Sequence, residues 1–238
     1  MYIVYPQHYQ DHTPPYEILN GEQTPHNEVP ARVDRILRAL DHAGHDPQAT
    51  QAQLDRHVVE RVHDPAYVRF LEERAAQITP DSYQYPSVFR YRAGRETHHP
   101  LGQLGNYSFD LYTPMHHGVF QAAWESATAA VDVAVRLRAE EVHVGYALCR
   151  PPGHHAEYDQ MGGYCYLNNA AIAAQLLSEG GRVATLDVDF HHGNGTQHIF
   201  TRVITCSLLR FTLTLTGSFR AFLAMRMSWE REEGEGIT

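Results

Sequence analysis

The stretch RVATLDVDFHHGNG, residues 182–195, decides the fold class. An apolar run of strand length ends there in acidic and imidazole side chains, and a glycine-rich turn follows. Such a run bounded by a turn is typical of a buried strand. In open α/β sheets, ligands bind at the carboxyl ends of the strands. The stretch therefore predicts a strand that presents functional side chains at its carboxyl end.

Apolar runs of strand length alternate with helical patterns on the N-terminal side of this stretch. Strands are expected at residues 1–6, 142–150 and 182–190, and helices at residues 29–44, 64–78, 118–141 and 166–181. Residues 80–114 show no sustained period, which predicts a long irregular and functional segment. The alternation as a whole predicts an α/β fold with an open, mostly parallel sheet and helices on both faces.

Composition limits the classes of protein that fit this sequence. The chain has 238 residues, 43% of them hydrophobic, which is enough for one domain with a full core. Its net charge of −9 disfavours nucleic acid as a ligand and favours cationic partners. Residues 1–12 contain no basic region and only a short apolar run, so we expect no signal peptide, no membrane span and a cytoplasmic location. The three cysteines lack metal-site spacing and are expected to be reduced thiols.

Alternation along the strand predicts that Asp187, Asp189 and His191 share one face, opposite Val188 and Phe190. Two such residues lie about 6 to 7 Å apart along a strand. Asp189 and His191 can therefore reach one cation together, and an oxygen and nitrogen donor set suits zinc or another divalent first-row ion. Asp187 lies one step behind, where it can orient a neighbouring histidine.

A second cluster, PPGHHAEYD at residues 151–159, strengthens the metal-site interpretation. On its own the first pattern can arise by chance, and aspartates at strand ends often cap the following helix. Two imidazoles beside a bound metal, however, suit metal-assisted amide hydrolysis. One takes a proton from the attacking water, and the other stabilises charge or protonates the leaving amine. The other histidine pairs, at 98–99 and 116–117, are expected to be surface or structural residues.

These motifs resemble a known family. Residues 150–174 and 183–200 look like the zinc-dependent histone deacetylase and acetylpolyamine amidohydrolase superfamily, whose fold is arginase-like. HNEVPAR at 26–32 and VHDPAYVRFL at 62–71 match more loosely. Residues 80–114 look most like the acetylpolyamine amidohydrolase branch, in which a long loop narrows the active-site entrance through a dimer. The resemblance therefore implies a homodimer.

The resemblance also implies roles for individual residues. His154 and His155 match the paired catalytic histidines, with His155 as general base and acid. Asp187 matches the partner of the first histidine, and Asn194 matches the partner of the second. The remaining matches are Asp189 and His191 as two of three zinc ligands, and Gly163 and Tyr164 as the lining of the acyl channel.

The implied reaction is hydrolysis of an N-acetyl amide on a cationic alkylamine, of acetylpolyamine or acetyl-lysine type. The resemblance implies zinc and a structural potassium ion as cofactors, with no nucleic acid or membrane partner. Two alternatives remain open. One is an inactive form that binds acylated amines. The other is an arginase-like dimetal hydrolase, disfavoured because Gly193 stands where that family has an Asp.

The sequence departs from the family after residue 207. The family's third zinc ligand is a later Asp, and a later Tyr stabilises the oxyanion, but no Asp follows Asp189 and no Tyr follows Tyr166. We therefore expect an incomplete deacetylase-like domain at 1–207 and an aberrant tail at 208–238, with the family's C-terminal part missing. The tail shows Thr-Leu repetition and no period that defines a core face, and in another frame it resembles the family's continuation, so we expect a shifted reading frame from about Leu208 to Arg231. The alternative is a divergent tail that forms a membrane-surface helix.

Overall fold

The largest sheet of the described residues is a parallel sheet of three strands. The computed structural model describes residues 1–90, 97–202, 207–208, 211–216 and 220–225. The strands lie in the order β4 (Gln48–Ala49), β1 (Tyr2–Tyr5) and β7 (Gly145–Ala147), and both neighbours run parallel to β1. Parallel pairing needs long crossover connections, which the helices between these strands supply.

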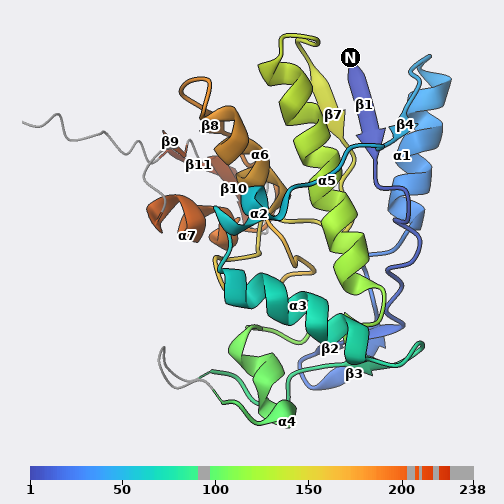
Figure 1. Cartoon of the computed structure of the whole chain (residues 1–238), viewed down its shortest axis with the longest axis vertical. Helices are drawn as coiled ribbons and strands as arrows, with labels where there is room; N and C mark the ends of the chain where they lie inside the picture. The colour runs from blue at the N-terminus through green and yellow to red at the C-terminus, as the bar shows by residue number, and fades with distance from the viewer. Residues whose placement is uncertain (91–96, 203–206, 209–210, 217–219, 226–238) are drawn as a thin grey trace, which may run out of the picture.

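Helices cover both faces of this sheet, as the sequence predicts (Figure 1). Successive side chains of β1 point to opposite faces. Val4 packs against Ala129 and Val133 of α5 (Val119–Arg138) on one face. Tyr5 packs on the other face in a cluster that includes Val33 of α1 (Ala31–His42). The fold class expected from the sequence is confirmed.

The largest core cluster lies where helices pack on one another beside the sheet. It gathers buried side chains of α3 (Pro65–Gln77), α5 and α6 (Asn169–Leu177), with a contribution from the short helix α2 (Arg56–Glu60). The four long helical patterns of the sequence are thus confirmed as α1, α3, α5 and α6. Each helix is shorter than its pattern, because the terminal residues form caps and turns.

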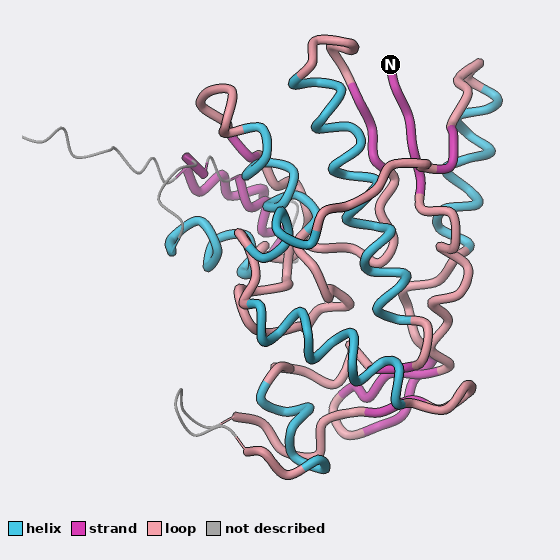
Figure 2. The backbone as a smooth tube through the Cα atoms, viewed as in Figure 1, coloured by secondary structure: helices cyan, strands magenta, loops and turns pink. Residues whose placement is uncertain are grey.

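Loops make up much of the end of the molecule where β2 and β3 lie (Figure 2). β2 (Tyr16–Leu19) and β3 (Glu22–Pro25) form an antiparallel hairpin. The segment 80–114 is less irregular than predicted. It contains the strand β5 (Tyr83–Gln84), the short helix α4 (Pro100–Gln103) and the 3-10 turn η1 (Leu104–Asn106). β5 pairs with β6 (Met115–His116), which follows the segment. His116 is buried in this region, which fits the structural role of the two roles expected for it.

The strand expected at residues 182–190 is the main correction to the predicted fold. Only β8 (Ala184–Thr185) has strand pairing, parallel to β9 (Ser207–Leu208). Leu186, Val188 and Phe190 are 57%, 76% and 57% exposed. In the part of the chain that the structure describes, β7 and β8 do not pair with each other. An extended segment without neighbouring strands cannot satisfy its backbone groups in a ladder, so regular pairing ends after Thr185.

Two further strands follow in the C-terminal tail. β10 (Phe211–Thr216) and β11 (Arg220–Met225) form an antiparallel hairpin, so the membrane-surface helix considered for the tail is wrong for these two segments. Residues 209–210, 217–219 and 226–238 lie outside the described residues. The domain boundary at 207 and the shifted reading frame stay predictions. Among the helices described, none is both long and apolar enough to cross a membrane.

Candidate active site

The loop that carries the paired histidines is anchored at its start by Arg150, a fully buried side chain three residues after the end of β7. The guanidinium donates to Glu28 at 3.1 Å and to the backbone carbonyls of Tyr9 and His12. A buried charge is tolerated only when it is paired and hydrogen-bonded in this way. Arg150 therefore ties the loop to the N-terminal segments on which it lies.

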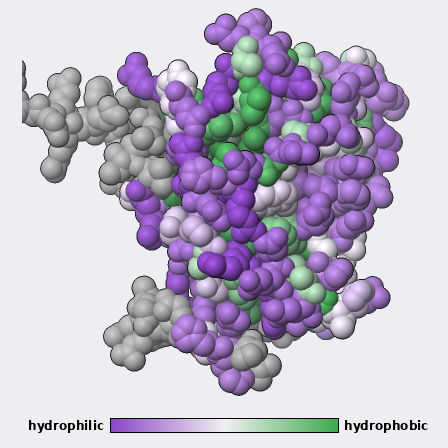
Figure 3. All heavy atoms as spheres, viewed as in Figure 1, coloured by the Kyte–Doolittle hydropathy of each residue, from purple (hydrophilic) through white to green (hydrophobic). Residues whose placement is uncertain are grey.

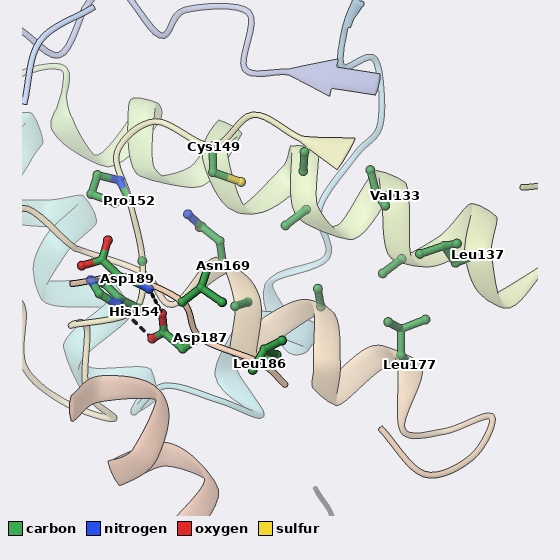
Figure 4. Close-up of a pocket in the computed structure, with 17 residues that line it drawn as sticks. Val133, Leu137, Cys149, Pro152, His154, Asn169, Leu177, Leu186, Asp187 and Asp189 are labelled. Atoms are coloured by element: carbon green, nitrogen blue, oxygen red, sulfur yellow. Dashed lines mark hydrogen bonds and ion pairs between the residues drawn. The ribbon is translucent and has the colours of Figure 1, made fainter. Parts of the chain in front are cut away.

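Each of the two adjacent histidines has its own hydrogen-bond partner, and the first histidine pair consists of His154 and Asp187. Their Nδ1 and Oδ2 atoms lie 3.0 Å apart, although 33 residues separate them in the chain (Figure 4). Burial alone would raise the pKa of Asp187, but the hydrogen bonds with His154 and with the backbone N–H of Asp189 outweigh it and lower the pKa. Asp187 is therefore ionised at neutral pH and fixes the His154 ring.

His155 and Asn194 form the second pair, with 2.5 Å between Nδ1 and Oδ1. The two histidine rings lie against each other, with centroids 4.0 Å apart. Burial lowers the pKa of His155, more than the hydrogen bond with Asn194 raises it. His155 is therefore neutral at pH 7 and has one nitrogen free to accept a proton. Asn194 begins α7 (Asn194–Arg202), so a helix end sets its position.

Asp189 and His191 contact each other near His154 and His155. The backbone N–H of His191 donates to Asp189 Oδ1 at 2.7 Å, and His191 Nδ1 lies 3.4 Å from the same oxygen. The rings of His191 and His155 meet edge to face, with centroids 6.0 Å apart. Both side chains are at least half exposed, so both can turn toward a cation.

The donors at this position suit a divalent first-row cation in type but fall short in number. A catalytic zinc takes three protein ligands and a water, with oxygen and nitrogen donors at about 2.0 to 2.2 Å. Within the described residues, no group of three or more His, Cys, Asp or Glu side chains could hold a metal ion. Asp189 and His191 can therefore supply two ligands, and a third has to come from elsewhere.

Gly163 lies beside His155, and Tyr164 follows it in the chain. Both have a left-handed backbone, with φ of +55° and +66°. A Cβ atom on Gly163 would overlap the His155 ring, so glycine is required for this close approach. Tyr164 donates its hydroxyl to Glu17 at 2.8 Å, and its backbone N–H donates to Thr113. The structure thus places Gly163 in contact with His155, while Glu17 holds the Tyr164 ring in place.

Comparison with known proteins shows the family of this chain. Residues 26–215 match the family of the histone deacetylase domain. The chain belongs to the histone deacetylase family. The resemblance seen in the sequence motifs is confirmed, because the match spans both motif regions, residues 150–174 and 183–200.

Relatives within the family carry names from the acetylpolyamine branch. Acetylpolyamine amidohydrolase 1 of Pseudomonas aeruginosa is 39% identical over 211 residues, which are 85% of this chain and 61% of that protein. Acetylpolyamine amidohydrolase of Mycoplana ramosa is 40% identical over 191 residues, 77% of this chain and 56% of that protein. The chain thus spans about three-fifths of the length of these curated relatives.

A solved structure gives the same result for the fold. The acetylpolyamine aminohydrolase of Burkholderia pseudomallei superposes with a TM-score of 0.80 at 32% identity, over 89% of this chain and 63% of that chain. The HDA15 HD domain superposes with a TM-score of 0.67 at 25% identity, over 88% of this chain and 53% of that chain. The deacetylase-like fold predicted from the sequence is therefore confirmed.

A cavity of about 680 Å³ adjoins the first histidine pair of this family member. It lies between α5 and α6, and His154, Asp187 and Asp189 lie at one end of it (Figure 4). Its other walls are mostly apolar, and apolar side chains reach the surface over α5 and α6 (Figure 3). The apolar lining consists mainly of Ala130, Val133, Ala134, Leu137, Ala147, Ala173, Leu177, Leu186 and Val188. Gly163 and Tyr164 do not line it.

Two acidic residues of the site are missed by reasoning from the sequence. Glu17 is 2% exposed and accepts from both Tyr164 and Asn27. Glu157 accepts from Asn194 Nδ2 at 2.9 Å. Glu17 lies 147 residues from Tyr164 in the chain, so no local pattern reveals the contact. Glu157 lies two residues after His155, and that adjacency is the one available signal.

Proposed function

We propose that this chain carries the hydrolytic site of a deacetylase that removes acetyl groups from N-acetylated alkylamines. The observation that supports the proposal is the arrangement of two histidines, each held by its own acceptor, beside Asp189 and His191. His154 is held by a carboxylate and His155 by a neutral amide. Two adjacent imidazoles in different electrostatic environments can perform different proton transfers.

The difference between the partners assigns the two roles. His155, with its pKa lowered by burial, is neutral and can take a proton from an attacking water. The same ring then returns the proton to the nitrogen of the leaving amine. His154 is hydrogen-bonded to the ionised Asp187, which holds its ring in place to stabilise the negative charge that develops on the acyl oxygen.

Asp189 and His191 are proposed to bind zinc or another divalent first-row ion together with a third ligand from outside the described residues. A bound ion of this kind lowers the pKa of water and polarises an acyl oxygen. The exposed position of both side chains leaves room for that third ligand.

The substrate proposed is a cationic acetylated amine of acetylpolyamine or acetyl-lysine type. The net charge of −9 favours a cationic substrate over an anionic one. The names of the relatives from Pseudomonas aeruginosa and Mycoplana ramosa support the acetylpolyamine type. The homodimer, the structural potassium ion and the cytoplasmic location stay predictions.

Acetate release tests the proposed function. The zinc-supplemented chain is incubated with an acetylated diamine or an acetyl-lysine peptide. We expect acetate release that His155→Ala reduces by about 10²-fold or more, the range for loss of a general base. His45→Ala, a change at an exposed histidine outside the site, should leave the rate unchanged. Equal rates in the chain and in His155→Ala would overturn the proposal.

A second candidate function is binding of acylated amines without turnover. The incomplete set of metal ligands in the described residues favours it. Calorimetry with the same acetylated diamine separates the two candidates. Binding without acetate release at any zinc concentration supports the second candidate, whereas release that rises with added zinc supports the first.

A further inference from the structure

Glu157 lies behind the second histidine pair and contacts two residues of α7. Its Oε1 accepts from Asn194 Nδ2 at 2.9 Å, and its Oε2 lies 3.0 Å from His198 Nδ1. Asn194 and His198 are four residues apart on one helix, so their side chains share a face. The Glu157 carboxylate therefore bridges two successive turns of that face.

The backbone of Glu157 is fixed by buried neighbours. Its carbonyl oxygen lies 2.8 Å from Nδ1 of His63, a side chain that is 0% exposed. The other ring nitrogen of His63 accepts from the backbone N–H of Asn168 at 2.9 Å. The N–H of Glu157 donates to the carbonyl of Gln160 at 2.8 Å. Because both backbone groups are bonded, the position from which the side chain extends is fixed, and the contacts with Asn194 and His198 hold the carboxylate.

An asparagine amide can present either its oxygen or its nitrogen to a neighbour. Facing His155 alone, Asn194 could take either orientation, since each tautomer of the imidazole suits one of them. A carboxylate only accepts hydrogen bonds, so Glu157 selects the orientation in which Nδ2 points toward it. Asn194 Oδ1 must then face His155, and His155 must donate from Nδ1. The Nε2 atom is left unprotonated.

We propose that Glu157 is a positioning residue, which sets the tautomer of His155 through the amide of Asn194. Its effect on catalysis rests on the proposed function, in which His155 needs an unprotonated Nε2 to accept the proton of water. The effect on the tautomer does not depend on catalysis and can be measured in the metal-free chain.

Nitrogen-15 NMR of the imidazole rings tests the proposal. The signals of His155 are assigned by their loss in His155→Ala and recorded at a pH where the ring is neutral. We expect the Nδ1–H tautomer in the chain itself and a mixture of both tautomers in Glu157→Leu. In Glu157→Leu/Asn194→Asp the Nδ1–H tautomer should return, because both oxygens of a carboxylate accept and no orientation has to be chosen.

Rescue by the second change distinguishes positioning from a merely structural role. Glu157→Gln keeps an acceptor for Asn194 and should retain most of the Nδ1–H tautomer, and Glu22→Leu is a control at an exposed carboxylate. An unchanged tautomer in Glu157→Leu, or no recovery in the double variant, would overturn the proposal. Acetate release by the same variants is recorded separately. If the chain itself releases none, the proposed function fails while the tautomer result still decides the role of Glu157.

Discussion

Gly193 shows how a single residue sets the geometry of the first histidine pair. It is buried, and a Cβ at this position would overlap the Asp187 carboxylate and approach His154 Nδ1 at 3.3 Å. Gly193→Ala should therefore displace Asp187 from His154. We expect a loss of about 1–3 kcal/mol in unfolding free energy, the usual cost of overpacking, and a loss of acetate release.

The control for this change is Gly118→Ala, because a Cβ at Gly118 meets its nearest atom at 3.8 Å. Urea unfolding and the acetate assay are applied to both variants. Equal urea midpoints for the two variants would show that Asp187 moves aside without cost.

His63 links the folding stability to pH. Burial lowers its pKa from 6.5 to about 4. As the pH falls below 6.5, the unfolded chain takes up a proton that the folded chain refuses until about pH 4, so stability is lost over that window. Between about pH 7.5 and about pH 5 the loss from His63 is on the order of 2 kcal/mol.

Urea unfolding at a series of pH values checks this expectation. His63→Gln keeps a donor and an acceptor at the position but does not titrate there. The dependence of the unfolding free energy on pH should therefore be shallower in His63→Gln by about the amount estimated for one histidine. The same slope in both proteins would contradict a titrating role for His63.

At the scale of the element, α6 depends on its N-cap. Asn168 Oδ1 accepts from the backbone N–H of Ala171 at 3.0 Å, and Nδ2 donates to the carbonyl of Ala156 at 3.1 Å. Asn168→Ala removes a cap worth about 1 kcal/mol and leaves a buried carbonyl unpaired, at a further cost of about 1–3 kcal/mol. Thermal unfolding should show a large loss for this variant. Ser178→Ala, at the other end of the same helix, should change stability by about 0.5 kcal/mol or less.

The helices and the strand β1 were predictable because their signals are local. The helical spacing of Val33, Ile36 and Leu37 needs no knowledge of the partner element. Strand length, in contrast, depends on neighbours. Exposure alternates along residues 183–188, as in a strand, yet Leu186 and Val188 are exposed and strand pairing ends at Thr185, because pairing and burial also require an adjacent strand.

The candidate site divides in the same way. The histidines, aspartates and Asn194 lie in two compact motifs that the sequence displays. Glu17 reaches Tyr164 only through the hairpin of β2 and β3, and Glu157 reaches His198 only through the placement of α7. Contacts of this kind arise from the packing of elements, so a sequence motif cannot show them.

At the scale of the whole molecule, the feature with the strongest consequence is the apolar groove formed by the cavity beside the first histidine pair. It lies between β7, in the three-stranded sheet, and the segment that follows β8. Its cavity of about 680 Å³ opens between α5 and α6, and Leu186 and Val188 line it while being more than half exposed. An extended segment with exposed apolar side chains, which has no strand partner after Thr185 within the described residues, is a site for intermolecular pairing. The chain should therefore bind a hydrophobic dye in its folded state and self-associate with rising concentration.

A charge at the edge of this groove should oppose that association. Val188 is 76% exposed, so Val188→Lys removes little burial and should change the unfolding free energy by about 0.5 kcal/mol or less. Lysine on an edge segment disfavours pairing with another chain, so light scattering should show less self-association. Val29→Lys, at a residue 42% exposed beside α1, adds the same charge away from the groove and should have little effect. If both variants reduced scattering equally, net charge would be the cause, and the groove would not be the surface through which the chain associates.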